Sequence, residues 1–241
     1  MGFYLFFNGG GSLEKCAIFI DGGYIDALLR RWGNFQLDYF KFSGKILEIV
    51  KADILRIYYY NCLPIVREMY DVKCPNCNNN FKVHFRSNED KLVICNDCLR
   101  KNRQKEIRIY NYTDELTNND KKYRDSKEKF YNKLKLLPRF EVKFGELQLI
   151  NGDFKQKGVD VLMSLDIVSK CFDKQIQHAI IIAGDSDFIP AIHKAKECGA
   201  VVHLFCNKNK VNNKLLFEVD EIYDLNYNFF ESLKMDINKA S

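Results

Sequence analysis

Two aspartates of a kind that could hold a cation stand directly after a strongly apolar stretch of the chain. The apolar run is Ala179 to Ala183, and the whole segment from Ala179 to Ile192, which includes both aspartates, reads AIIIAGDSDFIPAI. Its first half predicts a strand that is buried on both faces, and the residues after the turn predict a helix. Pro190 fits the first turn of that helix, where its missing N–H has no intrahelical partner. The carboxylates of Asp185 and Asp187 are therefore expected at a strand–turn–helix junction.

Two interpretations of this junction stay open on the stretch alone. Asp and Ser are preferred N-caps, so Asp185, Ser186 and Asp187 could serve only to begin the helix. The other interpretation is a ligand site, in which Asp185 binds the cation. In that case we expect Asp187 or Ser186 to share the capping of the helix terminus.

Further aspartates are expected at the same edge of the fold. Cys16 to Ile20 predicts a strand that ends on Asp21, and a helix follows it. Asp160 stands in the first turn of a helix predicted over Val159 to Phe172. Parallel strands bring their carboxyl ends to one edge of the sheet, where ligands bind. Asp21 and Asp160 are therefore expected to lie close to the aspartates of the first junction.

Clustered carboxylates predict a metal site. They repel one another and raise each other's pKa unless a cation is present. Oxygen ligands without converging His or Cys favour Mg²⁺ or Mn²⁺ over zinc. Such an ion can activate a water and neutralise charge on a phosphodiester. Asp166, on the same predicted helix, could be an outer ligand, but a structural hydrogen bond to the backbone, Ser, Lys or Arg is the favoured interpretation.

The elements that must position these residues alternate along the chain. Strands are predicted over 16–20, 54–60, 140–144, 147–150, 179–183, 200–206 and near 222. Helices are predicted over 24–32, 36–50, 125–137, 159–172, 188–198 and 227–235. Residues 152–158 are expected to form a polar loop. This alternation predicts an α/β fold, with a mainly parallel central sheet covered by helices on both faces.

Composition sets broad limits on the protein. A chain of 241 residues with 46% hydrophobic content can hold one α/β domain and a small extra module. The net charge of +5 permits a polyanionic partner. The amino-terminal run MGFYLFF is too short for a membrane span and has no basic region before it, so we expect a cytoplasmic protein without a membrane segment.

Four of the nine cysteines form two C-x2-C pairs. Cys74 and Cys77 are separated from Cys95 and Cys98 by seventeen residues, which matches the spacing of a zinc ribbon. Two such pairs can close a tetrahedral structural zinc site, and an iron site or a redox pair is the alternative. His84 is expected to be a strand residue because four thiolates complete the coordination. The ribbon strands are expected over 81–85 and 91–94.

The cysteine pairs lie in a segment whose composition differs from the rest of the chain. We expect an inserted module over 71–112, between two parts of the main domain over 13–70 and 113–235. Its low apolar content implies that metal binding supplies its folding free energy. Basic residues near both predicted sites could contact phosphate or could be a solvated surface; these are Arg100, Lys101, Arg103, Lys155 and Lys157.

Three blocks of the sequence carry a family resemblance. AIFIDGGYI, KGVDVLMSLDIV and IIAGDSDFIPAI, in that order, resemble the NYN branch of the PIN-like nucleases, close to the bacterial LabA-like group. The resemblance covers about 15–232 apart from the insert. It implies a PIN-like three-layer α/β/α fold and metal-dependent cleavage of RNA, with the acidic site at Asp21, Asp160, Asp185 and Asp187. Gly23 departs from the pattern, because many relatives have Asn two residues after the first Asp.

Together these features favour an endoribonuclease that uses Mg²⁺ or Mn²⁺. Its zinc-ribbon insert would bind RNA, or hold a protein partner or a second copy of the chain, and DNA is an alternative substrate. A regulator that binds nucleic acid or protein and keeps an inactive acidic pocket is the second hypothesis. A phosphatase or nucleotide hydrolase is a third, which the absence of a G-x-x-x-x-G-K-[ST] loop disfavours.

Overall fold

The structure is a computed structural model that describes residues 14–64, 67–86, 92–100, 106–108, 114–150 and 153–235. The chain divides into two compact units. The first unit contains residues 1–62, 134–146 and 156–241, and the second contains 63–133 and 147–155.

The strands and helices alternate through most of the described chain. The strands are β1 (Lys15–Asp21), β2 (Asp53–Cys62), β3 (Arg67–Lys73), β4 (Asn80–Arg86), β5 (Leu92–Ile94), β6 (Glu106–Arg108), β7 (Phe140–Ile150), β8 (Asp153–Lys157), β9 (His178–Ile182), β10 (Val201–Cys206) and β11 (Glu221–Asp224). The helices are α1 (Gly22–Arg31), α2 (Tyr39–Val50), α3 (Asn96–Arg100), α4 (Asp114–Lys135), α5 (Val159–Phe172), α6 (Ile189–Glu197), α7 (Asn213–Glu218) and α8 (Tyr227–Glu231), with a short 3-10 turn, η1 (Ser186–Phe188).

The central sheet has the strand order β11-β10-β9-β1-β2-β7-β8. The pairs from β11 to β7 are all parallel, so the chain must cross over between neighbouring strands. The chain leaves β1 towards β2 on one side and reaches β9 later on the other side of β1. The carboxyl ends of β1 and β9 therefore meet at the point where the strand order reverses, which is where ligands bind in sheets of this type.

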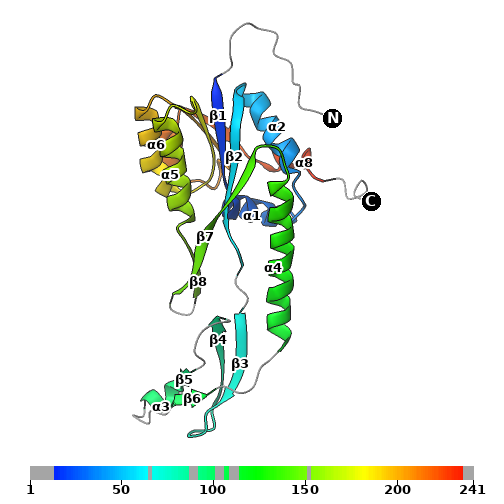
Figure 1. The fold of residues 1–241 in the computed structure, drawn as a ribbon, viewed down its shortest axis with the longest axis vertical. Helices are drawn as coiled ribbons and strands as arrows, with labels where there is room; N and C mark the ends of the chain where they lie inside the picture. Colours follow the sequence, from blue (N-terminus) through cyan, green and yellow to red (C-terminus); the bar gives the residue numbers. More distant parts are fainter. Residues whose placement is uncertain are drawn as a thin grey trace. The chain divides into compact units, whose positions relative to one another are not determined.

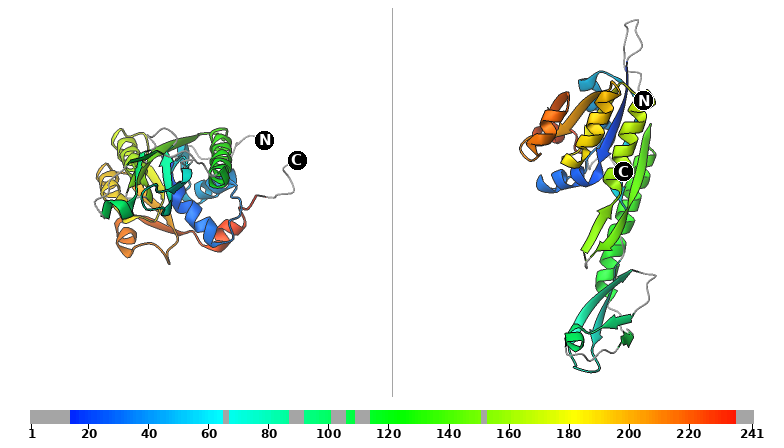
Figure 2. Two further views of the ribbon diagram at one scale, coloured as in Figure 1. Left: turned by 90° about the horizontal axis from the view of Figure 1, so that it is seen from below. Right: turned by 90° about the vertical axis from the view of Figure 1, so that its left-hand side faces the viewer.

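Helices cover both faces of the sheet (Figures 1 and 2). Helices α5 and α6 lie on one face, and α1 and α2 lie on the other. The strands between them are apolar on both faces, and Ile18, Phe19 and Ile181 have no exposed surface. The α2 side is closed by aromatic packing, with the rings of Phe42 and Phe230 stacked at 5.6 Å between centroids. This gives the mainly parallel α/β/α architecture that the sequence predicts.

Some predicted elements differ from the observed ones. Residues 152–158 were expected to form a loop, but β8 occupies most of that range. Strand β7 runs without interruption past Gly145, where the sequence pattern suggested a break. Helix α4 begins at Asp114, eleven residues before the predicted start. These differences fall where the sequence is polar and its apolar period is weak.

The second unit is small and has its own hairpins. Strand β3 pairs antiparallel with β4, and β5 pairs antiparallel with β6. The segments predicted as ribbon strands are strands, but they belong to these two separate sheets. His84 lies in β4. Among the described residues of this unit, Val72, Cys74, Cys95 and Cys98 form a buried cluster, with Phe81 and Val83 packed against it.

Among the described residues, no helix combines the length and the apolar character that crossing a membrane requires.

Candidate functional site

Asp21 is the last residue of β1 and also the N-cap of α1. Its Oδ1 accepts a hydrogen bond from the backbone N–H of Tyr24 at 3.0 Å. Burial, together with the carboxylates of Asp160 and Asp185, raises the pKa of Asp21 from 3.8 to about 6, against the lowering effect of the N–H groups of Tyr24 and Gly23. The cap uses Oδ1, which leaves Oδ2 for another partner.

Asp185 occupies the equivalent position after β9. Its backbone is extended, and its Oδ1 accepts a hydrogen bond from the N–H of Asp187 at 3.0 Å. The expectation that Asp187 or Ser186 would provide the cap was wrong, because Asp185 is the residue that stands immediately before the turn. Asp185 and Asp187 are both exposed. Asp185 therefore combines a capping oxygen with an exposed carboxylate, whereas Asp21 is half-buried.

Asp160 reaches the same region from α5. Gly158 begins this helix in the left-handed region, at a φ of 83°, and Asp160 follows in the first turn. Burial raises the pKa of Asp160, and the charges of Asp185 and Asp187 raise it further. Three separate segments thus place Asp21, Asp160, Asp185 and Asp187 in one electrostatic field at the carboxyl edge of the sheet.

The donor set of this acidic cluster suits a divalent cation. All the ligand atoms are carboxylate oxygens, which Mg²⁺ and Mn²⁺ prefer. Within the described part of the chain, no three of these carboxylates bring their oxygens within 4.8 Å of one another. A spread of this kind is expected of like charges, and a cation between them would offset the repulsion that raises the pKa of Asp21.

Tyr24 connects three strand ends at this edge, and the sequence analysis did not identify it. Its backbone N–H bonds to Asp21, and its hydroxyl accepts a hydrogen bond from the N–H of Asn207, just after β10, at 2.8 Å. Its ring lies so close to Gly184 that a Cβ atom at that position would overlap the ring. The only sequence signal for this role is a tyrosine three residues after the aspartate that ends a strand.

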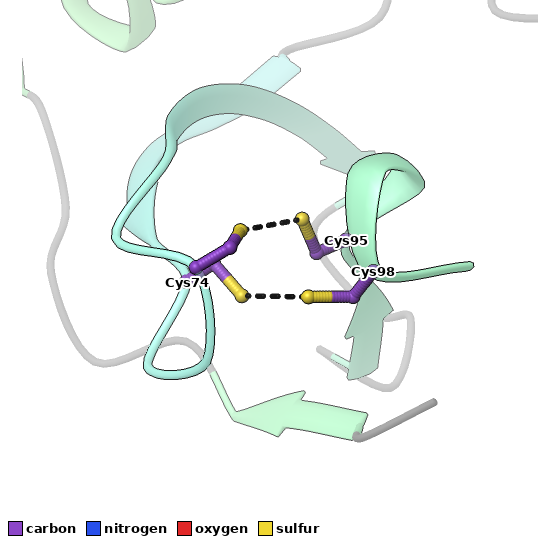
Figure 3. Close-up of side chains that lie close together, drawn as sticks. Cys74, Cys95 and Cys98 are labelled. Carbon is purple, nitrogen blue, oxygen red and sulfur yellow. Dashed lines mark hydrogen bonds between the residues drawn. The ribbon is translucent and has the colours of Figure 1, made fainter. Parts of the chain in front are cut away.

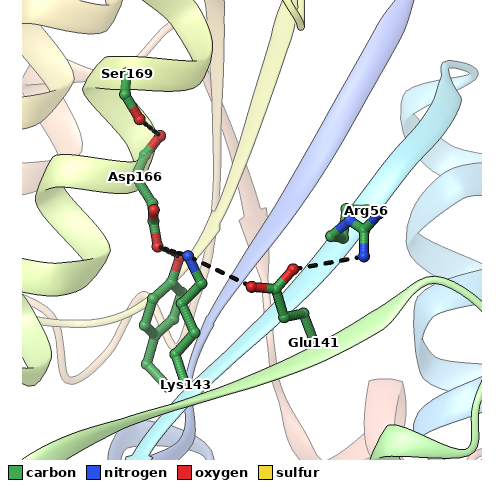
Figure 4. Close-up of polar contacts among 6 residues, drawn as sticks. Arg56, Glu141, Lys143, Asp166 and Ser169 are labelled. Atoms are coloured by element: carbon green, nitrogen blue, oxygen red, sulfur yellow. Dashed lines mark hydrogen bonds and ion pairs between the residues drawn. The ribbon is translucent and has the colours of Figure 1, made fainter.

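Asp166 lies further along α5 and has its own partners. Its Oδ2 accepts hydrogen bonds from the hydroxyl of Tyr60 and from the Nζ of Lys143, each at 2.7 Å (Figure 4). Its backbone carbonyl accepts a bond from the hydroxyl of Ser169 at 3.2 Å. Asp166 thus forms a structural ion pair within the first unit.

Ser186, the other residue expected to support the site from outside, lies in the η1 turn between Asp185 and Asp187.

The four predicted zinc ligands are gathered in the second unit. The sulfur atoms of Cys74, Cys77, Cys95 and Cys98 all lie within 4.8 Å of one another. The Sγ atoms of Cys74 and Cys98 are 3.6 Å apart, and those of Cys77 and Cys95 are also 3.6 Å apart (Figure 3). Cys74 and Cys77 lie in the turn between β3 and β4. Cys95 lies just before α3, and Cys98 lies in its first turn. Four sulfur atoms at these separations fit a tetrahedral metal ion.

Backbone N–H groups near the thiol cluster stabilise the thiolate form of Cys74. Burial alone would raise the pKa of the Cys74 thiol, but the N–H groups of Asn76 and Cys77 and the neighbouring thiols lower it to about 7. Burial and the adjacent thiols raise the pKa of Cys98 to about 12. Asn79 donates a hydrogen bond to Asp97, which links the two cysteine-bearing turns. A divalent ion would stabilise all four thiolates together.

The predicted basic contacts are only partly described. Lys155 and Lys157 lie in β8, and Arg100 is the last residue of α3. Lys101 and Arg103 lie outside the described residues.

Comparisons with known proteins agree with this architecture. The profile of the NYN domain matches residues 15–226. A solved structure of a protein of unknown function from Vibrio parahaemolyticus aligns with a TM-score of 0.54 at 14% identity, over 92% of this chain and 98% of that one. At this identity the likeness concerns the fold alone. A comparison with curated proteins found no match. Since the profile spans both Asp-bearing turns and the helix that carries Asp160, the chain belongs to the NYN domain family.

Proposed function

We propose that the protein is a metal-dependent endoribonuclease of the LabA-like branch, with its active site at the acidic cluster. The observation that carries the proposal is the meeting of Asp21, Asp160 and Asp185 at the carboxyl edge, where the charges of Asp160 and Asp185 add to the effect of burial in raising the pKa of Asp21. Membership of a family of PIN-like nucleases supports the same reaction.

Each aspartate has a distinct proposed role. Asp21, Asp160 and Asp185 would be the primary ligands of Mg²⁺ or Mn²⁺, and Asp187 would be a ligand or would position a water. Asp21 and Asp185 already have one oxygen fixed by a backbone N–H, so their second oxygens are held in place without further loss of rotamer freedom. Asp166 is occupied by Lys143 and Tyr60 and supports the site from outside.

The reaction that this arrangement supports is hydrolysis of a phosphodiester. A divalent ion bound by the carboxylates would supply a Lewis acid and a more acidic water. No protein nucleophile is required, because the attacking group is water.

For the second unit we propose a structural Zn²⁺ bound by Cys74, Cys77, Cys95 and Cys98. The support is the clustering of four sulfur atoms with a buried core that contains little else. The unit would then offer a folded surface for RNA or a protein partner beside its basic residues.

The first test is cleavage of labelled single-stranded RNA across Mg²⁺, Mn²⁺ and Co²⁺, with DNA in parallel. We expect Asp185→Asn to reduce kcat/KM at least about a hundredfold, because loss of a metal ligand should lower activity more than loss of an outer group that only orients a ligand. The asparagine Oδ1 can still accept the N–H of Asp187, so the turn should remain folded.

Asp173→Asn is the matched control, since Asp173 is an exposed residue at the other end of α5. It should leave cleavage unchanged. Full activity of folded Asp185→Asn would refute the assignment of the site. RNA that is bound but left intact by the unaltered protein in every metal would instead support a binding regulator.

A further inference from the structure

A lysine lies in the same row of the sheet as the acidic cluster. Asp21 on β1 is in register with Tyr60 on β2, and Tyr60 is in register with Lys143 on β7. Adjacent strands lie about 4.8 Å apart, so the Cα atoms of Asp21 and Lys143 are separated by roughly 10 Å. Lys143 is therefore close enough to act on the same extended ligand as Asp21.

The three side chains of this row point to the same face of the sheet. Tyr60 and Lys143 both bond to Asp166 on α5, which places them on the α5 side. The carboxylate of Asp21 interacts with that of Asp160, which belongs to the same helix. A ligand that crosses the carboxylates along this row would meet the ammonium group of Lys143.

The ammonium group of Lys143 is fixed by several contacts (Figure 4). Its Nζ lies 2.7 Å from Oδ2 of Asp166 and 3.6 Å from Oε1 of Glu141. It also lies 4.9 Å from the ring centroid of Tyr58. The side chain keeps 27% of its surface exposed, so the charge is held in place and still accessible. Pre-ordering of a long side chain removes part of the entropy loss on binding.

A cation beside the acidic cluster would reduce the repulsion between the cluster and the phosphates of a bound RNA strand. An RNA strand carries a negative charge at each phosphate, and the acidic cluster repels every phosphate that its metal does not neutralise. Arg56 does not meet this need, because it lies four residues further back along β2 than Tyr60 and so is further from Asp21. Lys143 is the cation that the strand register places beside Asp21.

We propose that Lys143 binds the backbone phosphate next to the one held at the carboxylate cluster, while Asp166 and Tyr60 hold its ammonium group in position. The inference rests on the proposed function and deepens it, since it names a residue that binds the substrate backbone. A phosphate contact of this kind fixes the register of the strand on the protein without reading its sequence.

The competing role for Lys143 is to neutralise Asp166 and nothing more. The two roles differ in a double variant. Lys143→Gln leaves Asp166 without its ionic partner, whereas Lys143→Gln with Asp166→Asn removes both charges and restores a neutral hydrogen-bonded pair. Lys143→Arg keeps the charge. Lys194→Gln is the matched control, because Lys194 is an exposed lysine paired with Glu197 at 2.8 Å in the last turn of α6.

The experiment measures binding of a fluorescent twenty-nucleotide oligouridylate across a series of salt concentrations. Each variant is made in the full chain carrying Asp185→Asn and is assayed at one fixed concentration of Ca²⁺ in place of Mg²⁺ or Mn²⁺, so that a cation is present at the carboxylates while the RNA stays intact. We expect Lys143→Gln and the double variant to weaken binding roughly fivefold and to reduce the slope of log K against log salt by about 0.7. Lys143→Arg and Lys194→Gln should match the parent.

The outcomes separate this inference from the proposed function. Restored affinity and slope in the double variant would overturn the phosphate contact and leave Lys143 a structural counterion. Cleavage by the otherwise unaltered enzyme that shows a raised KM and a nearly unchanged kcat for Lys143→Gln would support the contact. If the chain binds RNA with the expected Lys143 dependence but never cleaves it, the nuclease proposal fails and this inference stands.

Discussion

Asp21 and Asp185 each serve two purposes with one side chain. One carboxylate oxygen of each caps the following helical turn, and we propose that the other binds the cation. Capping alone would be satisfied by any Asp, Asn, Ser or Thr at these positions. Burial and the neighbouring carboxylates raise the pKa of Asp21 and of Asp160. Such a concentration of negative charge is not needed for capping, and the proposed cation site would account for it.

The charge on Asp21 should destabilise the folded protein when no cation is bound. Its pKa in the folded state, about 6, exceeds the ordinary value of 3.8, so folding favours the protonated form. That stabilisation is present below about pH 4 and is lost as the pH rises through 6. We expect Asp21→Asn to increase the free energy of unfolding at pH 7 by up to about 3 kcal/mol, with little gain at pH 4.

Urea denaturation at pH 4, 5, 6 and 7 in metal-free buffer checks this prediction. Addition of Mn²⁺ should narrow the difference between the two proteins at pH 7, because the cation stabilises only the chain that keeps the aspartate. A variant that is less stable than the parent at pH 7 would contradict the expected strain at this carboxylate.

The sequence predicted a structural hydrogen bond for Asp166, with Lys among the possible partners, but it did not predict which residues would form it. Each aspartate of the cluster stands beside an apolar run or in the first turn of an apolar helix, which is a local signal. Tyr60 and Lys143 lie 106 and 23 residues away from Asp166 along the chain, and only the pairing of β1, β2 and β7 brings them together. Sequence spacing carries no information about such a contact.

At the scale of the element, the turn after β9 is shaped by Tyr24 of α1. The backbone of Gly184 does not need a glycine for its conformation, because only Gly33, Gly158 and Gly199 among the described glycines have positive φ. What it needs is space, since the Tyr24 ring occupies the volume of its missing Cβ. The ring cannot move aside freely, because its hydroxyl is bonded to the N–H of Asn207.

Gly184→Ala should therefore destabilise the protein by about 1–3 kcal/mol, as overpacking does in a buried site. The clash would displace the turn that carries Asp185, so metal affinity should fall as well. A double-mutant cycle with Tyr24→Ala, followed by urea denaturation, checks the cause. The two changes should be less harmful together than the sum of their separate effects; strict additivity would mean that the ring is not what Gly184 accommodates.

The accuracy of the predicted elements follows the strength of their apolar pattern. Strand β9 and helix α5 lie within one residue of their predicted bounds, because β9 is a continuous buried apolar run and α5 has an apolar period that produces one buried face. Strand β8 was missed because its sequence, DFKQK, is mostly polar and gives no alternation that indicates a strand. Polar elements depend on a pairing partner, here the extended β7, which the local sequence does not reveal.

At the scale of the whole molecule, the two units have different sources of stability. The first unit has a large apolar core on both faces of its sheet, in which Ile18, Phe19 and Ile181 are fully buried. Among the described residues of the second unit, the buried cluster around the thiols Cys74, Cys95 and Cys98 contains one aliphatic side chain, Val72. A cluster of that size does little to offset the conformational entropy of its chain, so we expect a bound metal to contribute.

Removal of this metal should therefore unfold the second unit and leave the first unit folded. We expect one equivalent of zinc per chain by mass spectrometry, and a chelator or Cys95→Ser should abolish one thermal transition in calorimetry while a second persists. Limited proteolysis should then cut within residues 63–133, the main segment of the second unit. Cys198→Ser is the control, because Cys198 belongs to the first unit and lies outside the thiol cluster. Simultaneous loss of both transitions on chelation would mean that the thiol cluster supports the fold of the first unit as well.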